Sequence, residues 1–123
     1  MSWKINYNLE NKIIELSYND IVTPGELQQA FEETMKMVNQ YGSFLILADC
    51  RELKGGHTLF DLLELIEQIK VIDDKIFLKE AVILPLEKMP VSKVEFWETA
   101  CLNRGIKVKL FAESQIAINW LKI

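Results

Sequence analysis

Polar and apolar residues alternate at the start of the chain, in the pattern of strands that expose one face to water. Trp3, Ile5 and Tyr7 alternate with polar residues, and the same period of two returns at 14–18 after a polar, turn-like stretch at 10–12. Because such alternation buries one face of a strand and leaves the other in water, the pattern predicts an antiparallel hairpin.

Two later segments have the apolar period of a helix. Thr23 is a favourable N-cap, Pro24 suits the first helical position, and apolar residues recur at helical spacing until Gly42, a residue typical of helix ends. Thr58 and Asp61 have the spacing of a capping box and precede another such stripe. They predict the start of a second helix.

Three further runs predict strands. The runs 44–48 and 81–84 are uniformly apolar, as in strands covered on both faces, and the run 107–110 alternates lysines with apolar residues. The first run ends at Asp49, and we expect a loop at 50–57 after it.

Serines mark the expected starts of the last two helices. Ser92 and Glu95 repeat the capping-box spacing, which predicts a third helix that ends at Gly105, and Ser114 is the predicted N-cap of a short fourth helix. The element order is therefore β-β-α-β-α-β-α-β-α. Strands that alternate with helices of this length are joined by right-handed crossovers and lie parallel. This order therefore predicts one α/β domain over 1–123, with a mostly parallel five-stranded sheet and an antiparallel first strand.

Three stretches carry a resemblance to a known family: the strand end at 47–49, the strand start at 80–82, and the C-terminal stretch 108–121. They resemble the STAS-like superfamily (sulfate transporter and anti-sigma-factor antagonist domains), in particular its SpoIIAA-like branch of small stand-alone bacterial proteins. The resemblance covers nearly the whole chain and implies a SpoIIAA-like fold.

The resemblance implies a non-enzymatic regulatory or small-ligand-binding module, with a partner-switching interaction protein as the alternative. In partner-switching members a phosphorylated serine lies in an Asp-Ser-Ser-Gly-like turn at the start of the helix after the central strand. The matching stretch here is 56–59, where Thr58 takes the place of the serine without the preceding acidic residue or the following glycine. Thr58 is therefore the candidate phosphorylation site of that alternative.

Composition narrows the classes of function. The 123 residues are 50% apolar and 26% charged, as in a single globular domain, and the net charge of −4 has the wrong sign for a nucleic-acid partner. Two cysteines and one histidine make neither a disulfide framework nor a structural zinc site, so we expect no cofactor and no metal. No apolar run approaches the roughly 20 residues needed to span a bilayer, and we expect a cytoplasmic protein without membrane insertion.

The candidate site lies where the strands end. In open α/β sheets, ligands bind beyond the carboxyl ends of the strands, and here glycine N–H groups, helix starts and basic side chains would converge on a small anionic or amphiphilic ligand. Ordinary helix capping and a flexible loop would explain the same residues. The candidate ligand-binding residues are Asp49, Arg51, Lys54, Gly55, Gly56, His57, Thr58 and Ser92.

A catalytic alternative uses Cys50, His57 and Asp49, the residue types of a thiol-dependent hydrolase or transferase. The opposite interpretation is that Cys50 packs as a small apolar residue and His57 is solvated. We expect no catalytic residues.

The predicted second helix has a wider apolar surface than one contact needs, because Phe60 and Leu65 lie away from its main stripe. Burial between layers, a homodimer contact and the wall of an apolar pocket each explain this surface. We expect Phe60 and Leu65 to form an oligomer contact or a pocket wall. The expected partners are a second copy of the chain and a regulatory protein.

Overall fold

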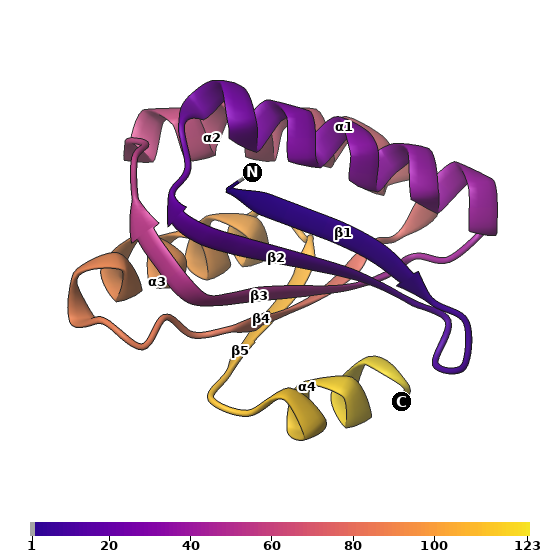
Figure 1. Cartoon of the computed structure of the whole chain (residues 1–123). Coiled ribbons are helices and arrows are strands. Elements are labelled where there is room, and N and C mark those ends of the chain that lie inside the picture. The colour runs from indigo at the N-terminus through magenta and orange to yellow at the C-terminus, as the bar shows by residue number, and fades with distance from the viewer. Residues whose placement is uncertain (1) are drawn as a thin grey trace.

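The computed structural model describes residues 2–123 as a five-stranded sheet with helices on both faces (Figure 1). The strands lie side by side in chain order; β1 is antiparallel to β2, and each later pair is parallel. The elements are β1 (Trp3–Asn8), β2 (Ile13–Ile21), α1 (Pro24–Tyr41), β3 (Leu45–Gly55), α2 (Leu59–Ile76), β4 (Lys79–Ile83), α3 (Lys88–Asn103), β5 (Lys107–Phe111) and α4 (Ser114–Leu121). The predicted fold class and element order are confirmed.

Helices cover the two faces of the sheet unequally. Helices α1, α2 and α3 cover one face, which we call the helix-side face, and α4 alone lies on the other, the α4 face (Figure 1). On the α4 face, Ala117 and Leu121 pack against an apolar cluster from β3, β4 and β5. Ile13 at the start of β2 joins this cluster, but the rest of this face over β1 and β2 is polar, and Asn6 donates a hydrogen bond to Glu15 there. The chain itself therefore covers the apolar half of the second face.

The first two helices begin as the sequence predicts. Thr23 accepts a hydrogen bond from the N–H of Glu26, whose carboxylate accepts one from the N–H of Thr23, and Gly42 closes α1 in the left-handed conformation at φ 64°. Thr58 and Asp61 form the same reciprocal pair at α2. Because these bonds satisfy N–H groups that have no partner within the helix, they fix where each helix starts.

The predicted loop at 50–57 is wrong over most of its length, because β3 continues to Gly55. The extension pairs with the end of β2, where Asn19 lies opposite Glu52 and Ile21 opposite Gly55. Two register shifts interrupt this pairing, and Asp20 has a positive φ of 60°. Polar residues on both strands hid the extension, since it stands partly in water and has no continuous apolar pattern.

The predicted starts of the last two helices are also wrong. Helix α3 begins at Lys88, so Ser92 lies inside it, and the N-cap is Glu87, which makes no side-chain cap. Pro90 is compatible with this start because a residue of the first turn needs no N–H partner. Ser114 is the first residue of α4 rather than its N-cap.

Candidate ligand-binding cleft

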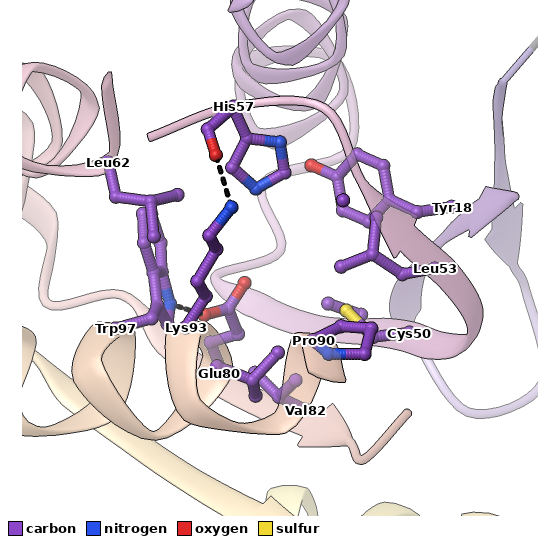
Figure 2. A pocket seen from close by; sticks show the side chains of 13 residues that line it. Tyr18, Cys50, Leu53, His57, Leu62, Glu80, Val82, Pro90, Lys93 and Trp97 are labelled. Atoms are coloured by element: carbon purple, nitrogen blue, oxygen red, sulfur yellow. Dashed lines mark hydrogen bonds between the residues drawn. The ribbon is translucent and has the colours of Figure 1, made fainter. Parts of the chain in front are cut away.

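A mostly apolar cleft lies between the helix-side face of the sheet and the helices α2 and α3 (Figure 2). Its volume is about 70 Å³, and a second hollow of about 50 Å³ continues toward α1. Tyr18, Glu80 and Trp97 border both hollows. Apolar walls with a few inward polar groups are the usual construction of a small-molecule site.

The position of α2 leaves room for the cleft. Helix α1 packs on β1 and β2, and α3 packs on β3 and β5, whereas α2 lies against α1 and α3 without a comparable approach to any strand. Leu62 of α2 reaches the outer hollow and Leu65 reaches the inner one. The cleft is thus the space that remains beneath a helix supported by its neighbours.

Glu80 places a carboxyl group on the floor of the cleft. It lies in β4 between Ile46 of β3 and Val108 of β5, where its side chain points to the helix side. Trp97 Nε1 donates a hydrogen bond of 2.7 Å to Glu80 Oε1. Burial raises the pKa of Glu80 to about 7, although the hydrogen bond from Trp97 acts in the opposite direction.

Lys93 and His57 form the rim of the cleft. Lys93 Nζ donates a hydrogen bond of 2.5 Å to the main-chain oxygen of His57, and no carboxylate in residues 2–123 lies within salt-bridge distance of this ammonium group. The imidazole of His57 is buried, and its Nδ1 lies 2.9 Å from the main-chain oxygen of Val22. The expectation of a solvated His57 is therefore wrong, because the imidazole fastens the end of β3 to the end of β2.

Tyr18 and Cys50 complete the sheet side of the cleft. The Tyr18 hydroxyl and the Cys50 thiol both have pKa values raised by burial, with the Glu80 carboxylate adding to each shift. Cys50 is buried and packs in the apolar core, as one of the two interpretations predicted. No hydrogen bond joins His57 to Cys50 within the described residues.

The structure divides the predicted site between two faces of the sheet. Gly55 and His57 line the cleft. Asp49 lies instead beside an open, polar hollow over β1 and β2, and Arg51 borders a neighbouring hollow at the end of β2. The Arg51 guanidinium donates to both carboxylate oxygens of Asp49. Partial burial opposes the effect, but these hydrogen bonds lower the pKa of Asp49. Lys54 lies at the surface, 4.0 Å from Asp20.

The remaining predicted residues surround the start of α2 or lie on α3. Gly56 has a φ of 109°, and a Cβ built there would lie 2.7 Å from the main-chain oxygen of Val22. Thr58 is exposed, but its hydroxyl is held in the capping box with Asp61. Ser92 is exposed on α3 and does not line the cleft. Phosphorylation of Thr58 stays a prediction.

The two apolar residues singled out on α2 have different surroundings. Leu65 is buried and lines the inner hollow. Its part in a ligand pocket or an oligomer contact stays a prediction. Phe60 is 67% exposed and lines neither hollow of the cleft. A homodimer contact through Phe60 stays a prediction.

The polar residues of the cleft escaped the sequence analysis, although the pattern contained a signal for them. Glu80 is two residues before Val82, and Tyr18 is two residues after Leu16, so each shares the inward face of its strand with an apolar neighbour. Lys93 precedes Trp97 by one helical turn and shares its face of α3. The signal that could have identified these residues was a polar side chain at the spacing of buried core positions.

The sheet order, its single antiparallel strand and the helices on both faces define a SpoIIAA-like α/β fold, which confirms the fold that the resemblance implied. A solved structure with this fold is an uncharacterised DUF3478-family protein from Shewanella loihica PV-4. It aligns with a TM-score of 0.56 and 17% identity over 97% of this chain and 91% of that chain. At this identity the similarity shows the fold alone. No protein-family model and no curated protein matches the chain.

The helices of residues 2–123 include none that is long and apolar enough to cross a bilayer.

Proposed function

We propose that this chain is a non-enzymatic binding module that takes a small amphiphilic molecule with an anionic group into the cleft beneath α2, in a regulatory role. The observation that carries the proposal is an apolar cleft with an ammonium group at its rim that forms no salt bridge within residues 2–123. The apolar body of the ligand would replace water against Leu53, Leu62 and Val82.

Lys93 supplies the expected contact for the anionic group. Its one protein partner in the described chain is the neutral main-chain oxygen of His57, which leaves two of its three ammonium protons for a ligand. Hydrogen bonds between two charged groups are stronger than those between neutral ones, and a partly buried rim shields them from water.

The state of Cys50 supports binding rather than thiol chemistry. A nucleophilic cysteine needs a thiolate, which a nearby base or positive charge generates. Here burial raises the pKa of Cys50, and the Nδ1 atom of His57 is engaged by the main chain of β2. Cys50→Ala would abolish the activity of a thiol enzyme, whereas a binding module would still bind its ligand, altered only by the packing that Cys50 contributes to the cleft wall.

Native mass spectrometry of gently purified protein is the first test. A mass above that of the chain, lost on denaturation, would reveal a bound molecule directly.

A titration with hexanoate, followed by amide chemical shifts, tests the cleft itself. We expect hexanoate to shift residues around Val82 and Val94, and Lys93→Met to weaken binding at least about tenfold through loss of a charged hydrogen bond. Lys88→Met is the matched control, because Lys88 is an exposed lysine on the same helix that does not line the cleft. Equal affinity in the two variants, or shifts confined to the α4 face, would overturn the proposal.

A further inference from the structure

Two polar atoms that line the cleft, the Tyr18 hydroxyl oxygen and Glu80 Oε2, form no hydrogen bond within residues 2–123. Trp97 donates to Glu80 Oε1, but no donor in residues 2–123 reaches Glu80 Oε2, and none of these residues forms a hydrogen bond with the Tyr18 hydroxyl. Polar groups in apolar surroundings are nearly always paired, because an unpaired one loses its hydration without compensation. Neither group is sealed from water, because Trp3 Nε1 is the one fully enclosed side-chain polar atom without a partner in residues 2–123. Both groups therefore face the open cleft, where a polar group of an entering molecule can pair with them.

Both groups occupy the place where such a partner would sit. Tyr18 and Glu80 border the outer hollow as well as the inner one, so they lie at the junction of the two. Figure 2 shows Glu80 on the floor of the cleft, with Lys93 and Trp97 on one side and Tyr18 on the other. A molecule that entered past Lys93 would meet apolar walls first and this polar pair further in.

We infer that Glu80 and Tyr18 form an inner subsite that binds a hydroxyl or amino group at the far end of the ligand. The inference rests on the proposed function and defines the ligand class more narrowly: a short carboxylic acid with an apolar middle and a second, hydrogen-bond-donating group. The carboxylate would pair with Lys93 at the rim, and the donor would pair with Glu80 Oε2.

The chemistry of the pair favours such a donor over a plain alkyl end. An ionised carboxylate accepts hydrogen bonds only, while a phenol both donates and accepts. A ligand hydroxyl can donate to Glu80 and accept from Tyr18, and a ligand ammonium can donate to both. An alkyl end would leave both protein groups unpaired and would exclude water from them. The site should therefore discriminate strongly against a ligand with an alkyl end in favour of one with a hydroxyl or amino end.

The experiment compares the affinities of hexanoate, ω-hydroxyhexanoate and ω-aminohexanoate at pH 8, together with their butanoate analogues to vary the length. Trp97 is the fluorescence reporter in a Trp3→Phe, Trp120→Phe background, which leaves one of the three tryptophans of the chain. We expect a donor-bearing acid of suitable length to bind at least about tenfold more tightly than the plain acid of equal length. The ratio of the dissociation constant of the plain acid to that of the donor-bearing acid should fall close to one in Glu80→Gln. In Tyr18→Phe it should fall to an intermediate value.

The results separate this inference from the proposed function. If plain acids bind in a Lys93-dependent way and the donor adds nothing, the inner subsite is wrong and the binding module stands. If the donor preference persists in both Glu80→Gln and Tyr18→Phe, with amide spectra that show a folded protein, the assignment of the subsite to these residues is wrong. If no acid of either series shows Lys93-dependent binding, the proposed function fails and the inference fails with it.

Discussion

Glu80 is the residue whose position most needs an explanation. A carboxyl group on an interior strand faces apolar side chains from β3, β5 and the helices, and one indole N–H is its only hydrogen-bond donor within the described chain. Such a group costs stability unless it is protonated or paired. The fold therefore carries a cost at Glu80 that a binding site would explain and a purely structural role would not.

This cost predicts how stability changes with pH. Because the pKa of Glu80 rises from 4.5 in the unfolded chain to about 7 in the fold, the folded state binds more protons between these values. Its contribution to the free energy of unfolding therefore falls as pH rises through that window, by at most about 3–4 kcal/mol at about 1.4 kcal/mol per pKa unit. Glu80→Gln should remove this fall and make the protein more stable than the wild type at pH 8, as measured by urea denaturation from pH 4 to 8.

Glu95→Gln is the control, since Glu95 is exposed on α3 and lines neither hollow. It should follow the wild-type curve. A Glu80→Gln curve parallel to that of the wild type would mean that the carboxyl of Glu80 stays ionised in the fold throughout, and that its surroundings are wetter than described.

At the scale of the elements, α2 is defined by its two ends and by its neighbouring helices. The Thr58 capping box starts it, and Phe77 ends it in the left-handed conformation at φ 52°. Gly56 lies just before the cap and passes close to the end of β2, with a Cβ position 2.7 Å from Ile21 Cγ2. The close approach of these two backbones sets the place at which α2 leaves the sheet, and so the height of the cleft.

Gly56→Ala should therefore be strongly destabilising. The methyl group would meet the main chain of Val22 as well as Ile21, and the positive φ of 109° disfavours any side chain. We expect a loss of about 2–4 kcal/mol from overpacking and strain together, measured by urea denaturation.

Gly42→Ala is the comparison that separates the overpacking from the backbone strain. Gly42 also has a positive φ, of 64°, but nothing lies within 4 Å of its Cβ position. Its loss should be about 1–2 kcal/mol, the cost of the backbone conformation alone. Equal losses of unfolding free energy in the two variants would show that the close approach of Gly56 to β2 does not contribute to the destabilisation.

At the scale of the whole molecule, the sequence predicted the architecture much better than the site. Periodicity and capping signals are local, so the strands, the starts of α1 and α2 and the sheet topology followed from them. The cleft depends on how far α2 stands from the sheet, which is a property of packing among three helices. Asp49 and His57 are close in the chain, yet the alternation of β3 places the first on the α4 face, away from the cleft that the second lines.

The two faces of the sheet therefore have different roles. Both are needed for stability, because each buries its own apolar cluster, and the sheet joins them into one folding unit. The proposed ligand, however, meets only the helix-side face. Leu62 and Leu121 allow a direct test, since both are buried leucines and only Leu62 lines the cleft.

Leu62→Ala and Leu121→Ala should each lower the free energy of unfolding by about 2–5 kcal/mol, because each deletes a buried side chain. Ligand affinity should separate them. With the probe acid measured at low temperature, where circular dichroism shows both variants folded, Leu62→Ala should change the dissociation constant several-fold and Leu121→Ala should leave it unchanged. An equal change in both would mean either that the ligand binds on the α4 face or that the sheet transmits the packing defect to the cleft, and an amide-shift map of the bound state would tell these two apart. A change in Leu62→Ala alone would establish that the cleft beneath α2 binds independently of the helix that covers the other face.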